Sequence, residues 1–342
     1  MRIALRQAPR GALVALCLAV VVWLALKGSK DGITFLQVTF NGLTIGGLFF
    51  VVAAGFTLIF GLMRVVNMAH GSLYLFAGYL AYKAQANWFH GAATQFSLST
   101  TSSVSVVALV VPLIYATVVI GLVGLAIQQV LLRWNQGQDL RQALITIAVS
   151  VIFADQLLAH YGGIAVGISQ PTSWPLSIHV GAFRYPFFRL VVVLGAAVLI
   201  GVLLYLLIRR TRFGMIIRAG VDDRSMLSAL GVNVQLVFAG AFFLGAMLAG
   251  LAGVLGGTMI SVGPGLDTQF LLSALIVVII GGMGSLGGAA IGAVLLGLVQ
   301  NYSADYLKFG STDLTNYAIL LTFILVIVVL AVRPLGLFGR PA

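Results

Sequence analysis

The stretch FNGLTIGGLFFVVAAGFTLIFGLMRVVNMAHG, residues 40–71, determines the class of fold. Residues 40–63 carry no charge, and a helix needs about 20 apolar residues to cross a bilayer core about 30 Å thick. An arginine, an asparagine and a histidine then interrupt the apolar sequence at Arg64, Asn67 and His70. We therefore expect a membrane-spanning helix, followed by a polar turn that leads into the next span.

The rest of the chain has the composition of an integral membrane protein. Of its 342 residues, 61% are hydrophobic and 8% are charged, whereas soluble proteins are roughly 45–50% apolar and about 25% charged. No polar segment is long enough to form a soluble domain, so we expect one all-α domain over residues 1–342, a polytopic membrane helix bundle with about ten (eight to ten) transmembrane helices. The expected spans are residues 11–26, 38–61, 68–89, 106–132, 143–161, 187–208, 234–256, 270–283, 287–304 and 315–332.

The basic residues indicate the orientation of the chain. When the spans alternate from a cytoplasmic N-terminus, most of the 19 arginines and lysines lie on the cytoplasmic side, as the positive-inside rule requires. We therefore expect both termini and the long loop 209–234 in the cytoplasm. Residues 11–26 are expected to be an uncleaved anchor helix; a cleaved signal peptide is the alternative, but no small-residue cleavage site follows the span. The same bias accounts for the net charge of +11 without a nucleic-acid partner.

Motifs for catalysis or cofactor binding are missing. The chain has one cysteine, no glutamate and four scattered histidines, so we expect no metal site and no catalytic residue. Gly282, Gly284 and Gly287 spell GxGxxG, but residues 268–304 carry no charge, which argues against a nucleotide-binding helix with a solvated face. The GxxxG spacing of Gly284, Gly288 and Gly292 instead predicts close packing of two membrane helices.

The loop RRTRFGMIIRAGVDDRSMLSALGVNV, residues 209–234, carries five arginines and an adjacent pair of aspartates. One interpretation is a solvated cytoplasmic loop. Its pattern, however, resembles the ATPase-coupling loop of the permeases in bacterial branched-chain amino acid ABC importers. The residues that carry this resemblance are Arg218, Ala219, Asp222, Asp223, Leu230 and Gly231.

Three further stretches resemble the same family. Residues 40–71 are similar to its first signature, and residues 263–293 and the closing RPLGLFG, residues 333–339, also match, so the resemblance extends over nearly the whole chain from about residue 35. Met68, Ser72 and Leu227 depart from the family pattern. Because related permeases for urea or short amides share most of the pattern, these substrates remain an alternative to branched-chain amino acids.

The resemblance implies an importer in the bacterial inner membrane. Its expected partners are a second, identical or homologous permease, two cytoplasmic ATPase subunits, a periplasmic solute-binding protein, membrane lipid and a small amino acid as substrate, with no cofactor. Glycine-interrupted stretches near residues 42–61 and 278–292 are where transporters tend to form binding sites. Residues expected in the translocation pathway or its gate are Asn41, Gly42, Thr44, Asn67, His70, Gly71, Gly281, Gly282, Gly284 and Ser285.

Two points stay open on the sequence alone. Asn67 and His70 either cap the helix that re-enters the membrane or form part of an inner gate. Asp155 lies within an expected span, and it would be the main candidate for ion coupling if the chain were a secondary transporter. A structural membrane protein without a solute is a further alternative.

Overall fold

The computed structural model describes residues 32–339, apart from 64–65, 90–103, 136, 223–226, 228, 310–311 and 314–316. The expected anchor helix 11–26 lies outside these residues. The α-helices in the described part are α2 Gly32–Met63, α3 His70–Phe89, α4 Val107–Ala126, α5 Asp139–Tyr161, α6 Leu194–Arg210, α7 Arg212–Asp222, α9 Val234–Met259, α10 Leu266–Gly281, α11 Leu286–Tyr306 and α12 Ala318–Val332. The π-helical segments Ile127–Leu132 and Phe188–Val193 extend α4 and precede α6, and a 3₁₀ turn covers Arg133–Asn135.

The expected all-α class is confirmed, and each expected span from 38–61 onward overlaps a helix. Six helical stretches are long and apolar enough to cross a membrane: Gly32–Gly61, Val107–Asn135, Asp139–Tyr161, Phe188–Arg210, Val234–Met259 and Leu286–Tyr306. The helices α10 and α12 are shorter apolar helices. The second half of α3 contains Lys83, Gln85 and Asn87, which makes this helix more polar than α2 or α4.

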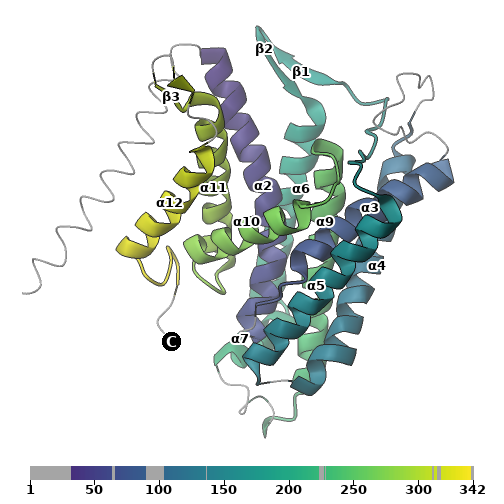
Figure 1. Ribbon diagram of the computed structural model, residues 1–342. Helices are drawn as coiled ribbons and strands as arrows, with labels where there is room; N and C mark the ends of the chain where they lie inside the picture. The colour runs from purple at the N-terminus through teal and green to yellow at the C-terminus, as the bar shows by residue number, and fades with distance from the viewer. Residues whose placement is uncertain are drawn as a thin grey trace, which may run out of the picture.

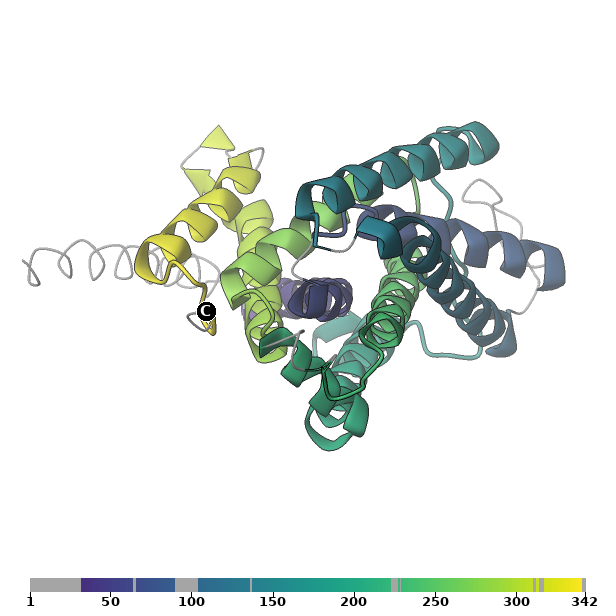
Figure 2. The same cartoon turned by 90° about the horizontal axis from the view of Figure 1, so that it is seen from below.

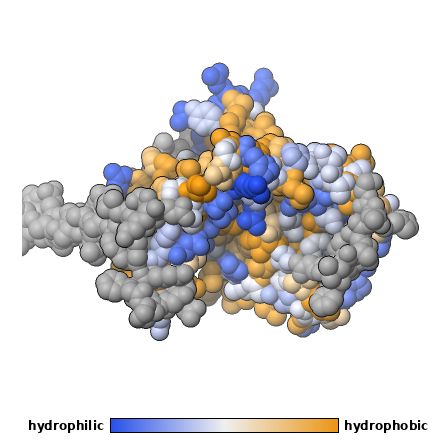
Figure 3. Space-filling model, turned by 90° about the horizontal axis from the view of Figure 1, so that it is seen from above, coloured by the Kyte–Doolittle hydropathy of each residue, from blue (hydrophilic) through white to orange (hydrophobic). Residues whose placement is uncertain are grey.

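Two small antiparallel hairpins lie at one end of the bundle (Figure 1). The strands β1 Ser177–Val180 and β2 Phe183–Pro186 pair with Ser177 opposite Pro186, and β3 Lys308–Phe309 pairs with β4 Thr312–Asp313. We call this the hairpin end, and the opposite end, where α7 lies, the α7 end. Seen from the hairpin end, hydrophilic residues gather over the middle of the face, with hydrophobic residues between and around them (Figure 3).

The helix α2 forms the centre of the bundle, and it is seen end-on in the middle of Figure 2. In the most apolar 18-residue segment of α2, 83% is buried within this one chain. The corresponding share is 17% for α5 and for the Phe188–Arg210 stretch. Uninterrupted apolar sequence on all sides of a helix suits such a central position. The exposed apolar faces of α5 and α6 are among the surfaces left for lipid or for another chain.

The packing has the pattern of an inverted repeat. The helix α2 leads to α3 and α4 as α9 leads to α10 and α11. The contacts are exchanged between these two sets: α4 packs on α9 while α11 packs on α2, and α3 packs on α9 while α10 packs on α2. In Figure 1 the two long helices α2 and α9 run in opposite directions through the bundle, so one set is inverted relative to the other, as in many transporters.

Close approach of α10 and α11 depends on glycines, as the GxxxG spacing predicted. A Cβ atom on Gly288 would overlap the carbonyl oxygen of Gly281, and one on Gly292 would lie 2.7 Å from the carbonyl oxygen of Val277. The prediction is wrong for Gly284. This residue has φ = +82° and belongs to the turn before α11, where it faces Gly61 of α2 rather than the helix pair.

Replacing Gly288 with alanine should therefore destabilise the bundle, because the added methyl group forces α10 and α11 apart. Overpacking of this kind costs about 1–3 kcal/mol. The matched control is Gly287→Ala on the same helix, where a Cβ would have no atom within 4 Å. Thermal unfolding in detergent should show a lower midpoint for Gly288→Ala alone; equal midpoints for the two variants would contradict the role of this contact.

Candidate functional site

The N-terminal ends of α3 and α10 meet inside the bundle. Gly71, in the first turn of α3, allows this approach, since a Cβ there would overlap the backbone oxygen of Asp267 in the first turn of α10. The imidazole Nε2 of His70 lies 3.0 Å from the carbonyl oxygen of Val52, near the middle of α2. From Val52 to Met63, the last residue of α2, is about 16 Å along the helix axis. Both helices thus begin well inside the bundle.

His70 is buried completely, and its ring stands edge-on to Phe56. This position corrects the expectation that His70 lies with Asn67 at a surface turn. The chain turns back after α2, and His70 is therefore found beside the middle of that helix instead of its end. Its side chain connects α3 to α2 and does not cap α3.

Asn67 does cap the re-entering helix, as one of the two interpretations predicted. Its Oδ1 accepts a hydrogen bond from the backbone N–H of Ala69 at 3.1 Å, and its carbonyl oxygen accepts one from the N–H of His70 at 3.3 Å. The N–H of Met68 donates to Oγ1 of Thr146 on α5. These bonds satisfy backbone groups at the start of α3, in the interior of the protein, where Asn67 is 2% exposed. Arg64 lies outside the described residues.

Asn41 and Thr44 belong to a polar network near the hairpin end. The hydroxyl of Tyr185 on β2 donates to Oδ1 of Asn41 at 3.1 Å and lies 3.0 Å from Oγ1 of Thr44, while Nη1 of Arg189 reaches Asn41 at 3.5 Å. Burial raises the pKa of Tyr185, so its hydroxyl remains a donor at neutral pH. These residues attach the β1–β2 hairpin to α2.

Gly42 has a different neighbour. A Cβ at this position would lie 3.0 Å from Cα of Leu298, so Gly42 allows α11 to pack closely on α2. A role for Asn41, Gly42 or Thr44 in solute passage stays a prediction.

The turn between α10 and α11 is joined by the end of the chain. Gly282 has φ = +98°, and Ser285 caps α11 by accepting a hydrogen bond from the N–H of Gly288. The N–H groups of Leu337 and Phe338 donate to the carbonyl oxygens of Ile280 and Gly281 at 2.8 and 3.0 Å. Two of the stretches that resemble the family, 263–293 and 333–339, are therefore in direct contact. The gate role expected for Gly281, Gly282, Gly284 and Ser285 stays a prediction.

The helix α7 lies on the surface with one apolar face inward. Ile217 is buried, and Phe213 packs on Gly240 of α9. Arg218 and Ala219 are exposed, and Leu230 is 72% exposed. The side chains of Asp222 and Asp223 lie outside the described part. The loop 209–234 thus has part of its expected coupling residues at the surface, and their coupling role stays a prediction.

Two further residues complete this surface segment. Gly231 has φ = +79°, a left-handed conformation that a β-branched side chain would strain. Leu227, which departs from the family pattern, is 5% exposed and serves to anchor the segment.

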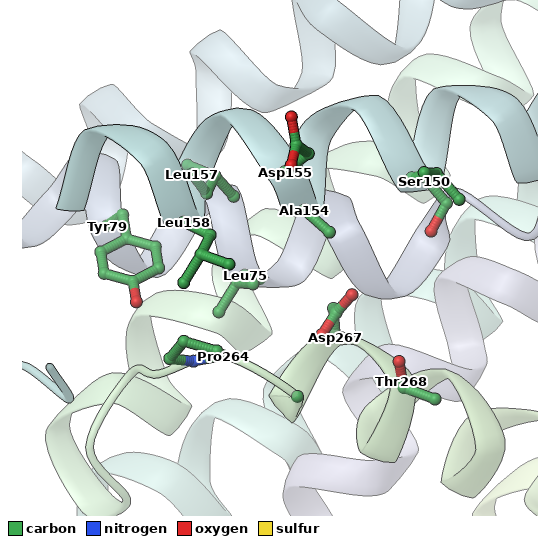
Figure 4. Close-up of a pocket in the computed structure, with 12 residues that line it drawn as sticks. Leu75, Tyr79, Ser150, Ala154, Asp155, Leu157, Leu158, Pro264, Asp267 and Thr268 are labelled. Carbon is green, nitrogen blue, oxygen red and sulfur yellow. The ribbon is translucent and has the colours of Figure 1, made fainter. Parts of the chain in front are cut away.

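A cavity of about 400 Å³ lies between α3, α5 and the start of α10 (Figure 4). Asp267 and Thr268 of α10 lie opposite α5, which contributes Ser150 and Asp155 to the lining, and Tyr79 of α3 lies toward one end. Asp155 is exposed, and its carboxylate points away from Asp267 (Figure 4). The sequence alone pointed to Asp155 but not to Asp267 as a candidate acid. The available signal was a single acid directly before a long uncharged stretch, residues 268–304.

Comparisons with known proteins agree with the resemblance seen in the sequence. The family model described as "Branched-chain amino acid transport system / permease component" matches residues 38–330. The chain is 30% identical to the high-affinity branched-chain amino acid transport system permease protein LivH of Escherichia coli K12, over 92% of this chain and 98% of that protein. It is also 30% identical to the permease protein BraD of Pseudomonas aeruginosa, over 90% of this chain and 96% of the relative. No solved structure matches the chain.

Replacing Asn67 with alanine should destabilise the start of α3, because the N–H of Ala69 loses its acceptor in the interior. Loss of such a cap costs about 1 kcal/mol. Asn67→Ser keeps an acceptor oxygen and should restore most of the stability. The measurement is the midpoint of thermal unfolding in detergent, and an Asn67→Ala variant as stable as the serine variant would show that the cap contributes nothing.

Proposed function

The chain belongs to the family of permease components of branched-chain amino acid transport systems, and from this premise we propose how it works within an ABC importer. It is a multi-pass membrane protein and a permease subunit without catalytic activity of its own. The observation that carries this conclusion is the match along residues 38–330, together with relatives covered over nearly their full length.

The substrate we propose is a branched-chain amino acid. The LivH and BraD relatives are named as permeases of high-affinity branched-chain amino acid transport. These names support leucine and similar neutral amino acids over urea or short amides. The apolar side chain of such a solute suits a pathway between apolar helices, while its charged groups require polar partners at a few points.

We propose that this chain forms the pathway with a second permease, identical or homologous. In a single copy, only 17% of the most apolar 18-residue segment is buried in the Asp139–Tyr161 stretch and in the Phe188–Arg210 stretch. Such faces are available to another permease as well as to lipid. Two cytoplasmic ATPases and a periplasmic binding protein complete the proposed importer, and ATP-driven closure of the ATPases moves the permeases between inward and outward access.

The α7 end is proposed to face the cytoplasm. Arg209, Arg210, Arg212 and Arg218 are exposed there, which accords with the positive-inside bias. On this orientation the β1–β2 hairpin faces the periplasm, where the binding protein docks. The helix α7 then lies where an ATPase subunit reaches it, with its apolar side held by α2, α6 and α9.

Uptake should depend on the whole importer. Proteoliposomes that contain this chain, its partner permease and two ATPases should accumulate radiolabelled L-leucine only with internal ATP and the loaded binding protein outside. Accumulation by the permeases alone on a proton or sodium gradient would indicate a secondary transporter instead. Urea and acetamide serve as the competing substrates, and preferential uptake of either would overturn the proposed specificity.

Coupling should depend on the exposed face of α7. Arg218→Glu reverses one charge on that face without touching the buried side of the helix, so the permease should insert at normal levels. We expect the ATPases to co-purify poorly, with uptake and receptor-stimulated ATP hydrolysis falling together by about tenfold or more, since hydrogen bonds to charged groups contribute about 1.5–3 kcal/mol.

The matched control is Arg184→Glu, which reverses an exposed arginine on β2 at the hairpin end. This variant should retain the ATPases. If Arg218→Glu also retains them in full and transports normally, 209–234 is a solvated loop and the coupling assignment fails.

A further inference from the structure

The cavity between α3, α5 and α10 contains buried polar groups without partners. Asp267 is 8% exposed, and no hydrogen bond or ion pair of its carboxylate is found among the described residues. Tyr79 is 1% exposed, and its hydroxyl has no hydrogen-bond partner within the described part of the chain. A buried hydroxyl and a largely buried carboxylate without protein partners are unfavourable unless a ligand pairs with them. Both groups are suited to a ligand that donates hydrogen bonds, and the carboxylate to one that carries positive charge.

The surroundings of Asp267 supply little compensation from the protein itself. Its position in the first turn of α10 places it at the positive end of a helix dipole, which is favourable for an acid. None of the residues that line the cavity is basic, and the second acid among them, Asp155, is exposed and directs its carboxylate away from Asp267. An acid that faces a cavity without a counter-charge favours binding of a cation beside it.

The other lining residues are mainly apolar. Leu75 of α3 and Leu157 and Leu158 of α5 border the same space, and Val151 and Ala154 continue it toward Ser150. The cavity volume of about 400 Å³ falls within the range of roughly 300–1,000 Å³ that small-molecule sites occupy. A ligand with one cationic group and one aliphatic group matches this distribution.

We propose that this cavity binds the transported amino acid by its ammonium group, with Asp267 as the buried acceptor. The inference rests on the proposed function, which supplies an amino acid as the solute. An ammonium group has three donors, and the cavity offers the carboxylate of Asp267 and the hydroxyl of Tyr79 as acceptors. The aliphatic side chain of the solute lies against the leucines of α3 and α5.

The location of the cavity suits a site on the pathway. It adjoins the point where the starts of α3 and α10 meet, at Gly71 and Asp267. One wall belongs to α5, which is the less buried helix. Movement of α5 relative to α10 therefore changes the space beside Asp267, so that the site is closed in one arrangement of the helices and open in another.

The first test compares Asp267→Asn with Asp139→Asn in the complete importer. Asparagine keeps the shape of the side chain and remains favourable at a helix start. Asp139 also lies in the first turn of a helix, α5, but it is exposed and does not line the cavity. We expect leucine uptake to fall about tenfold or more for Asp267→Asn, because a charge-assisted hydrogen bond is lost. The Asp139→Asn variant should transport normally, and both should retain their ATPases.

The second test reports the charge of the cavity without transport. In a Cys17→Ser background, Ala154→Cys places one thiol on the cavity wall of the assembled complex. A cationic methanethiosulfonate reagent should modify it several-fold faster than an anionic one of similar size, and Asp267→Asn should remove most of this preference. Leucine-loaded binding protein should slow the modification.

The outcomes separate the two proposals. If the unmodified importer fails to take up leucine, the proposed function is lost. If it transports leucine and Asp267→Asn transports equally well, the cavity inference alone is lost. It is also lost if the variant loses uptake while the preference for the cationic reagent is unchanged, since Asp267 then acts structurally. If a high sodium concentration restored leucine uptake by the Asp267→Asn variant, the cavity would bind an inorganic cation. This result would likewise overturn the inference.

Discussion

The main constraint on this structure is that two helices begin in the interior of a membrane protein. The first N–H groups of a helix have no partner within it, and a membrane interior offers no water in their place. Asn67 and Thr146 supply acceptors where α3 begins. At the other end of α10, the backbone of Leu337 and Phe338 supplies donors to its last carbonyl groups. The start of α3 and the end of α10 are thus satisfied by a segment distant in the sequence or by a side chain beside them.

Close backbone packing follows from the same arrangement. The connection after α2 and the connection after α9 both turn back into the bundle. Each of these two helices therefore packs against a short helix, against a long helix and against the other. Glycines make this possible, as at Gly42 against α11 and at Gly288 against α10. Small residues at such crossings increase contact between backbones where the hydrophobic effect gives no preference for protein over lipid.

The helix α9 connects the two regions proposed to act in transport. Near its start, Gly240 lies against Phe213 of α7, and near its end, Gly253 and Gly256 lie against Tyr74 of α3. Tyr74 directly precedes Leu75 and lies on the same helix as Tyr79, and both of these residues line the cavity. A displacement of α7 by an ATPase therefore acts on a helix that is itself packed against the wall of the proposed solute site. The continuous contacts from α7 through α9 to α3 are a route for coupling. The Arg218 and Asp267 variants test the two ends of this route separately.

The sequence by itself determined the class of protein, the position of nearly every helix in the described part and the family, because length and hydropathy decide which segments can cross a bilayer. It also predicted the cap at Asn67 and the packing of Gly288 and Gly292. Only the tertiary structure decided the depth of His70, the turn position of Gly284 and the importance of Asp267. Hydropathy gives the ends of a span but not how far the chain returns toward the interior after it. The position of Asp267 opposite α5 likewise depends on how α10 crosses α5, and the spacing of 112 residues between Asp155 of α5 and Asp267 carries no local signal of that arrangement.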